Sequence, residues 1–258
     1  PENPVLPAED VKGIVEFDHV SFAYPEAGEN VLTDISFKAK KGQTIAVIGS
    51  TGSGKSTLIN LIPRYYDVTK GSVKVDGVDV RDMTQKELRD KLGYVPQKGV
   101  LFSGTIDSNI RYGKPEITDA QVKEAAEVAQ ATEFIDTKPE KYESPVSQGG
   151  TNVSGGQKQR LSIARAIAKD PEIFIFDDSF SALDFKTDSQ LRKALKEYTK
   201  DATTVIVAQR ISTILGADQI IVLDDGHMAG IGTHKELMAN CEVYQQIARS
   251  QLSEEELA

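Results

Sequence analysis

The sequence has a single cysteine, no long apolar run and no internal repeat. Cys241 is alone among 258 residues, so no disulfide bond can form within the chain, which is typical of a reducing, cytosolic setting. We expect its thiol to be a structural or surface group. No stretch approaches the roughly 20 consecutive apolar residues that a membrane-spanning helix requires, and no signal-peptide pattern is expected.

An excess of basic residues is also missing. The chain has 30 Lys and Arg against 39 Asp and Glu, a formal net charge of −9. A general nucleic-acid-binding protein needs a basic face, so this charge argues against DNA or RNA as a partner. Apolar residues make up 39% of the chain, which is enough for a packed core. The length allows one large α/β domain or two small ones.

Residues 1–12 are proline-rich and acidic and show no periodicity, so we expect a linker there. A chain that starts at Pro1 with such a segment suggests a piece cut from something longer. The folded domain is expected to span residues 13–258.

Two kinds of strand pattern follow the linker. Alternating apolar and polar residues at 14–17, 35–39 and 73–77 predict half-buried strands of a small antiparallel sheet. Short continuous apolar runs predict strands buried on both faces; alternating with helices, they are typical of a mostly parallel sheet. These runs lie at residues 44–48, 92–95, 173–176, 203–207 and 219–223.

Apolar residues at helical spacing predict helices over residues 119–130 and 155–169. We expect an α-helical subdomain at about residues 98–156. The predicted fold is therefore α/β, with a mostly parallel central sheet, a small antiparallel β subdomain and an α-helical subdomain.

A glycine-rich loop lies between the first buried strand and a helix-like segment. Residues 49–57 read GSTGSGKST, which matches the phosphate-loop pattern G-x-x-x-x-G-K-[ST] of P-loop NTPases in its strand–loop–helix context. Glycines let backbone N–H groups close around phosphate oxygens, and the positive end of the next helix points at the same anion. Lys55 is expected to reach the β- and γ-phosphates of ATP, and Ser56 to offer its hydroxyl to Mg²⁺. The expected ATP-binding residues here are Ser50, Thr51, Gly52, Ser53, Gly54, Lys55, Ser56 and Thr57.

Two acids, Asp177 and Asp178, follow the apolar run 173–176. We expect that strand directly beside the phosphate-loop strand, because its carboxyl end is then where Mg²⁺ needs a ligand. Asp177 is expected to hold the metal through water, since Mg²⁺ keeps most of its hydration shell, and Asp178 to face the attacking water. The alternative is that both acids are exposed and cap the following helix.

The helix predicted from residue 155 has an unusual start. Ser154 can cap it, while Gly155 and Gly156 leave its N–H groups uncovered, and Gln157 follows them. This is a second anion site. One phosphate loop does not need a second γ-phosphate site in its own chain, so we expect this one to bind a nucleotide held by another subunit.

With these motifs the chain resembles the nucleotide-binding domain of an ATP-binding cassette (ABC) transporter over essentially all of residues 13–250. The resemblance implies that Tyr24 stacks on adenine, that Gln97 reaches Mg²⁺ and faces the helical insertion, and that residues 153–157 are the signature motif. The implied metal-binding residues are Ser56, Gln97 and Asp177, and the D-loop ends at Asp184.

Two positions depart from the family pattern. Asp178 stands where the family usually has Glu, and Gln209 stands at the switch position, which is usually His. The Asp carboxylate lies about 1.5 Å short of a Glu carboxylate, and an error of about 1 Å can cost 10²-fold in rate. Gln209 can donate a hydrogen bond to a γ-phosphate but cannot carry the charge of an imidazolium. We expect Asp178, Gln209 and Gln97 to be the catalytic group of a slow site.

That asymmetry resembles one half of a heterodimeric ABC exporter, in which one composite ATP site is degenerate and the other hydrolyses ATP. The resemblance implies an ATPase that drives export of a substrate at the cytoplasmic face of the cell membrane. Its implied partners are a second, non-identical nucleotide-binding domain and a transmembrane domain, with no nucleic acid. Ser154, Gly155 and Gly156 would complete the partner's site. No histidine (His19, His227, His234) is expected to touch phosphate.

Two alternatives remain open. One is a nucleotide-holding regulatory module with negligible turnover. The other is a soluble ABC protein that acts on ribosomes or DNA. Proteins of that kind carry two cassettes or a coiled-coil insertion, neither of which the sequence contains, and the acidic charge counts against it.

Overall fold

The computed structural model describes residues 1–253 and divides into two compact units. Unit 1 comprises Pro1–Leu92 and Ala202–Ala258, and unit 2 comprises Gly93–Asp201. The expected domain extends to residue 258, so its last part, residues 254–258, lies outside the described residues. Within residues 1–253, no helix is both long enough and apolar enough to cross a membrane.

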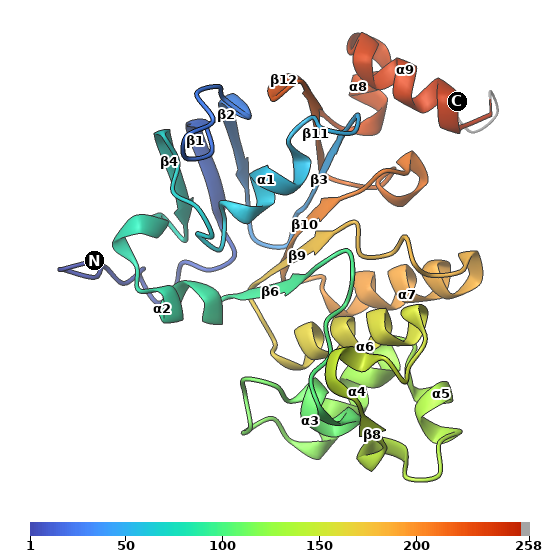
Figure 1. Cartoon of the computed structure of the whole chain (residues 1–258). Helices are drawn as coiled ribbons and strands as arrows, with labels where there is room; N and C mark the ends of the chain where they lie inside the picture. Colours follow the sequence, from blue (N-terminus) through green and yellow to red (C-terminus); the bar gives the residue numbers. More distant parts are fainter. Residues whose placement is uncertain (254–258) are drawn as a thin grey trace. The chain divides into compact units, whose positions relative to one another are not determined.

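The predicted antiparallel sheet forms in unit 1, where its strands follow the order β2-β1-β4-β5 (Figure 1). They are β1 (Val15–Phe22), β2 (Leu32–Ala39), β4 (Lys70–Val75) and β5 (Val78–Asp79). Inward-facing residues of β1 are buried, and Phe17 stacks on Phe37 of β2 with ring centroids 4.6 Å apart. The three alternating patterns in the sequence thus correspond to β1, β2 and β4.

A second sheet carries the phosphate loop. Its strands in unit 1 follow the order β12-β11-β3-β10. They are β3 (Thr44–Gly49), β10 (Thr203–Val207), β11 (Gln219–Asp224) and β12 (His227–Gly232). β3 pairs in parallel with β10 and with β11, so both of its edges are occupied. The prediction that the strand ending at Asp177 lies directly beside β3 is therefore wrong. An apolar run encodes burial on both faces, but it does not encode which strand is the neighbour.

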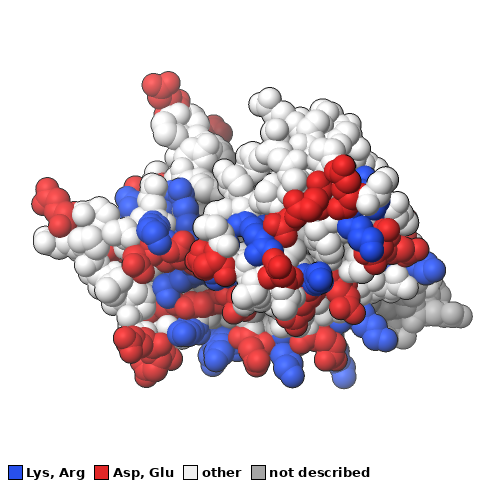
Figure 2. Space-filling view, turned by 90° about the horizontal axis from the view of Figure 1, so that it is seen from below, with Lys and Arg blue, Asp and Glu red and all other residues white. Residues whose placement is uncertain are grey.

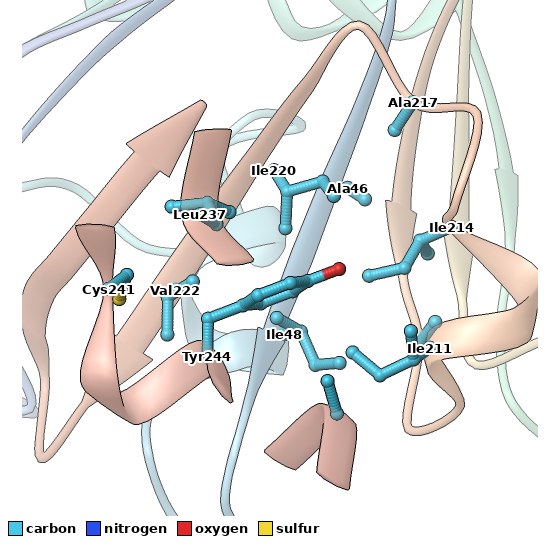
Figure 3. Close-up of a cluster of buried hydrophobic side chains, with 12 residues drawn as sticks. Ala46, Ile48, Ile211, Ile214, Ala217, Ile220, Val222, Leu237, Cys241 and Tyr244 are labelled. Atoms are coloured by element: carbon cyan, nitrogen blue, oxygen red, sulfur yellow. The ribbon is translucent and has the colours of Figure 1, made fainter. Parts of the chain in front are cut away.

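The last helices of unit 1 pack against this sheet and share a hydrophobic core with it (Figure 3). The helices and 3-10 turns of unit 1 are α1 (Lys55–Asn60), η1 (Val80–Asp82), α2 (Gln85–Asp90), η4 (Ile211–Thr213), α8 (His234–Asn240) and α9 (Glu242–Gln251). Tyr244 of α9 is fully buried against Ile48 of β3 and Ile220 of β11. Cys241 lies in the same cluster and is buried, as expected for a structural thiol.

Unit 2 consists mainly of helices. Its elements are β6 (Leu92–Val95, which starts at the boundary), β7 (Gly104–Thr105), α3 (Ile106–Ile110), α4 (Asp119–Val128), α5 (Thr132–Asp136), η2 (Lys141–Glu143), β8 (Pro145–Val146), η3 (Gln148–Gly150), α6 (Gly155–Ala168), β9 (Ile173–Asp177) and α7 (Phe185–Tyr198). β9 and β6 are neighbouring strands, and β7 pairs with β8. The two predicted helices correspond to α4 and α6.

Charged side chains of both signs are mixed on the face shown in Figure 2. Lys and Arg alternate there with Asp and Glu, and over the described residues this face carries no continuous basic area. That face therefore lacks the basic stripe by which nucleic acids are held.

Candidate functional site

Two glycines of the phosphate loop lie close to other atoms of unit 1. A Cβ atom on Gly49 would lie 2.4 Å from the carbonyl oxygen of Leu223, and one on Gly54 would lie 2.8 Å from Leu32 Cδ2. Gly54 also has a φ of 101°, a left-handed conformation that glycine adopts without steric cost. Gly54 is the residue directly before α1. The fold thus requires glycine at both ends of the loop.

Hydrogen bonds hold the loop in a compact turn. Ser53 N donates to Ser50 O at 3.1 Å, and Gly226 N donates to Ser53 O at 3.1 Å. Lys55 Nζ donates to the carbonyl oxygens of Gly49 at 2.6 Å and Ser50 at 3.3 Å, which brings its charge back over the loop. The hydroxyl oxygen of Ser53 is buried and has no hydrogen-bond partner among the described residues. Since a buried polar atom ordinarily has a partner, this loop fits a polar ligand.

Tyr24 lies next to this loop. Its hydroxyl is 2.8 Å from Thr57 Oγ1 of α1. Its ring packs edge-to-face against Tyr66, with centroids 5.2 Å apart, and against Phe22, with centroids 4.9 Å apart. The structure thus brings a half-buried aromatic group and the phosphate loop together within unit 1.

Gln209 lies two residues beyond β10, whose carboxyl end runs alongside that of β3. Its side chain is exposed. Its backbone is held by a residue that the sequence did not single out. Gln251 Nε2 donates to Gln209 O at 2.7 Å, and Gln251 Oε1 accepts from Ile211 N at 2.8 Å. Gln251 ends α9, and the polar composition around it gives no signal of this contact.

In unit 2, Asp177 and Asp178 stand at the end of β9 as predicted. Gln97 Nε2 donates to Asp178 Oδ2 at 3.2 Å, so the structure brings two of the expected catalytic residues together. Asp178 has a φ of 51°, a left-handed conformation that is uncommon outside glycine. The next residue, Ser179, is buried, and its hydroxyl donates to Val95 O of β6 at 2.7 Å.

The alternative in which these two acids cap the following helix is wrong. The cap of α7 is Asp184, whose carboxylate accepts from Thr187 N at 2.8 Å and from the Thr187 hydroxyl at 2.9 Å. The backbone hydrogen bond from Thr187, followed by its hydroxyl bond, lowers the pKa of Asp184. The expected D-loop residue is therefore a helix cap within this chain.

The loop that carries Gln97 is held by Gln159, a residue absent from the predicted site. Gln159 is 1% exposed. Its Nε2 donates to Pro96 O at 3.0 Å, and its Oε1 accepts from Gly99 N at 2.7 Å. One amide of α6 thus bonds to the backbone on both sides of Gln97. A glutamine on the apolar face of a predicted helix is the signal that could have indicated it.

The glycines at the start of α6 are less crowded than Gly49 and Gly54 of the phosphate loop. Ser154 caps the helix by accepting from Gln157 N at 3.1 Å, and the Gln157 side chain bonds back to Ser154 N. A Cβ atom on Gly155 would meet nothing within 4 Å, and one on Gly156 would meet nothing closer than 3.8 Å. The described residues of this chain therefore leave Gly155 uncovered, and they leave Gly156 half-buried but without a close contact.

The histidines have partners elsewhere. His19 Nδ1 is 2.7 Å from Asp34 Oδ1, and this hydrogen bond raises its pKa. His234, the first residue of α8, is 2.6 Å from the Tyr244 hydroxyl, and burial lowers its pKa. His227 Nδ1 is 3.0 Å from the carbonyl oxygen of Asp225.

The residues expected to bind the metal carry oxygen donors. Among residues 1–253, no cluster of three or more His, Cys, Asp and Glu could hold an ion. Mg²⁺ does not need one, because it is usually bound by one or two protein oxygens together with phosphate oxygens and water. The Ser56 hydroxyl, the Gln97 amide oxygen and the Asp177 carboxylate are groups of that type.

Comparison with known proteins identifies the family. The family model described as "ABC transporter" matches residues 32–181. The chain is similar to an uncharacterized ABC transporter ATP-binding protein of Mycobacterium bovis, with 48% identity over 254 residues, 97% of this chain and 43% of that protein. It is also similar to the Bacillus subtilis protein named "Putative multidrug export ATP-binding/permease protein YgaD", with 48% identity over 90% of this chain and 40% of that protein. The chain belongs to the ABC transporter family.

A solved structure gives the same result for the fold. A bacterial Atm1-family ABC exporter with ATP bound matches 98% of this chain and 44% of that chain, with a TM-score of 0.92 and 38% sequence identity. The α/β fold predicted from the sequence, and its resemblance to an ABC nucleotide-binding domain, are confirmed. The chain spans less than half the length of each of these relatives.

Proposed function

We propose that this chain binds ATP with Mg²⁺ and, with a second nucleotide-binding domain, hydrolyses it to drive export of a substrate across a membrane. ABC ATP-binding domains are ATPases in general, the Bacillus subtilis relative is named as an ATP-binding/permease protein for export, and the similar solved structure is of an ABC exporter. The proposed place is the cytoplasmic face of the cell membrane, with the transmembrane domain of the same exporter as a partner. Nucleic acid has no part in this function.

In the proposed mechanism, residues of the phosphate loop bind and orient the triphosphate. Backbone N–H groups of residues 50–57 donate to its oxygens, and the Lys55 ammonium offsets charge on the β- and γ-phosphates. Tyr24 stacks on the base. Ser56 and Asp177 hold Mg²⁺, which supplies positive charge to the phosphates when it is bound.

The observation that carries this proposal is the uncovered start of α6. A helix start with a Ser cap and two glycines is suited to an anion, and the described residues of its own chain leave Gly155 exposed and do not crowd Gly156. The phosphate loop already supplies one phosphate site. We therefore assign Ser154, Gly155 and Gly156, with Gln157 behind them, to the nucleotide of a partner domain.

A cluster of exposed aromatic side chains in unit 2 supports contact with a membrane partner. Phe102 and Tyr112 are 40% and 57% exposed, and their rings stack with centroids 4.3 Å apart. The Arg165 guanidinium lies 5.2 Å from the Phe102 ring centroid, and burial lowers the pKa of Arg165. Exposed aromatic and Arg groups are enriched in interfaces. The relatives are more than twice as long as this chain. We therefore propose that the transmembrane part of the exporter covers this aromatic cluster.

The proposed site of this chain is degenerate. Asp178 replaces the longer Glu, and its carboxylate already accepts a hydrogen bond from Gln97. Gln209 replaces the expected His. These two observations favour a second candidate function, a module that holds nucleotide with negligible turnover while its partner's site hydrolyses ATP.

The test is a titration of the chain with Mg-ATP, followed by turnover measured with and without the partner domain. We expect the chain to bind Mg-ATP alone and to hydrolyse it slowly. An isolated rate on the order of 10 s⁻¹, the median for enzymes, would contradict the degenerate site. No binding of Mg-ATP would contradict the proposed function as a whole.

A further inference from the structure

The loop that carries Gln209 is attached to the C-terminal helix of unit 1 by one side chain. Gln251, the last residue of α9, donates to Gln209 O at 2.7 Å and accepts from Ile211 N at 2.8 Å. The side-chain amide of Gln251 has both a donor and an acceptor, so it can bond to a carbonyl oxygen and to an N–H group of the same backbone segment. A single residue thus fixes the segment on both sides of Arg210.

Helix α9 is itself fixed in the core. Tyr244 and Ala248 are fully buried, and they share one cluster with Ile48 of β3 and Ile211 of η4. Figure 3 shows the Tyr244 ring pointing among Ile48, Ile211 and Ile220. Ile211 follows Gln209 by two residues. The position of α9 is therefore transmitted to this loop by apolar packing and by the two bonds of Gln251.

Gln209 needs such support because, among residues 1–253, its backbone has no other hydrogen bond. Its side chain is exposed, and β10 ends two residues before it. An exposed segment without a fixed backbone samples many conformations, and ordering it on binding costs free energy. A loop that is held beforehand directs the Gln209 amide without that cost.

We propose that Gln251 is a positioning residue for Gln209, so that the C-terminal helix α9 controls how well this chain distinguishes ATP from ADP. This inference rests on the proposed nucleotide site, in which Gln209 donates a hydrogen bond to the γ-phosphate. ATP has a γ-phosphate and ADP does not, so only ATP binding depends on Gln209. Loss of the two bonds then weakens binding of ATP and leaves binding of ADP unchanged. Gln251 itself touches no nucleotide.

Two variants and a matched control test the inference. Gln251→Ala removes both bonds. Gln251→Glu keeps the acceptor for Ile211 N but places a carboxylate oxygen against Gln209 O, so it disturbs only the Gln209 side. Gln245→Ala is the control, because Gln245 lies on the same helix and donates a similar bond, of 2.8 Å, to Met238 O of α8. Each variant is titrated with Mg-ATP and Mg-ADP, and amide exchange at residues 207–211 is measured.

Gln251→Glu should bind ATP about threefold to tenfold more weakly, the range expected for one lost hydrogen bond, and Gln251→Ala, which loses two bonds, should bind it at least as weakly. The affinity of both variants for ADP should stay within twofold of the wild-type affinity. Amide hydrogen exchange at Ile211 should accelerate only in Gln251→Ala, because Gln251→Glu keeps the acceptor for Ile211 N. Gln245→Ala should leave both affinities unchanged. Equal losses for ATP and ADP, or an unchanged ratio in both Gln251 variants, would overturn the inference while the nucleotide site stands. A wild-type chain that binds neither nucleotide would overturn the proposed function and this inference with it.

Discussion

The chain contains two glycine-rich segments, and they differ in what surrounds their glycines. In residues 49–57, added Cβ atoms on Gly49 and Gly54 would lie within 2.8 Å of Leu223 O and Leu32 Cδ2. In residues 154–157, an added Cβ on Gly155 meets nothing within 4 Å. The first pair of glycines is required by the fold of this chain, whereas the second is not.

We propose that this difference separates a site that the chain uses from a site that it supplies to a partner. Gly49 and Gly54 are explained by close approach within unit 1, and no such contact with described residues explains Gly155. The sequence predicts the same distinction, because only residues 49–57 match the full phosphate-loop pattern. The following predictions test that distinction.

The largest expected effect comes from blocking the open segment. Ser154→Ala combined with Gly156→Asp places a carboxylate where a partner's γ-phosphate is proposed to lie. At about 4 Å and an effective dielectric of 20, like charges repel by on the order of 4 kcal/mol. The variant chain mixed with its partner domain should lose ATP-driven dimerisation and most ATP hydrolysis.

The same double variant should fold and bind ATP normally when it is alone. An added Cβ at Gly156 meets no atom closer than 3.8 Å, and an acid in the first turn suits the helix dipole. Nucleotide affinity of the lone chain and turnover of the reconstituted pair are measured together. A lone chain that loses affinity while the pair keeps its rate would mean that the segment acts within its own chain.

The second prediction concerns the two positions that depart from the family pattern, Asp178 and Gln209. Asp178→Glu with Gln209→His restores the longer carboxylate and the imidazole of the family pattern. We expect hydrolysis at this site to rise by up to about 10²-fold, the size of effect that a 1 Å error in position produces. ATPase rates of the pair, with the partner's own site inactivated, check this. An unchanged rate would show that neither residue limits turnover.

The third prediction concerns Lys55. Lys55→Ala should weaken ATP binding by the lone chain about tenfold to hundredfold, because a charge-assisted hydrogen bond contributes about 1.5–3 kcal/mol. Lys86→Ala is the matched control, since Lys86 is an exposed lysine of α2 paired with Asp90. Equal affinities of the Lys55 variant and the wild type would rule out the phosphate loop as the binding site.

The smallest effects should appear in folding stability. Gly49→Ala should lower the free energy of unfolding by about 1–3 kcal/mol, because the new methyl group overlaps a backbone carbonyl oxygen. Gly155→Ala should leave the free energy of unfolding unchanged or raise it by roughly a few tenths of a kcal/mol, since alanine favours a helix. Denaturant unfolding of both variants measures this difference. Similar destabilisation by the two would remove the contrast between the segments.

Local patterns predicted most of the elements. The run 203–207 coincides with β10, the run 44–48 forms β3, and the cap at Ser154 is where the sequence placed it. These features depend on neighbouring residues only, so the sequence encodes them directly.

Contacts between distant residues were not predictable in the same way. Parallel pairing placed β10 and β11, not the strand ending at Asp177, on the two edges of β3. Gln159 and Gln251 bond to backbone atoms 60 and 42 residues away. Such bonds leave no periodic trace, because any glutamine can make them once the fold brings a carbonyl oxygen and an N–H group within reach. The assignment of residues to catalysis likewise stays a prediction.

The cap of α6 also determines the direction in which Ser154 can form a further hydrogen bond. Its oxygen already accepts from Gln157 N. The hydroxyl hydrogen can then point outward as a donor, beside the donor N–H groups of the first turn. The Ser154 hydroxyl and the N–H groups of Gly155 and Gly156 thus form a set of donors at this helix start. Such a set favours an anion over a cation, although the chain as a whole carries a net charge of −9.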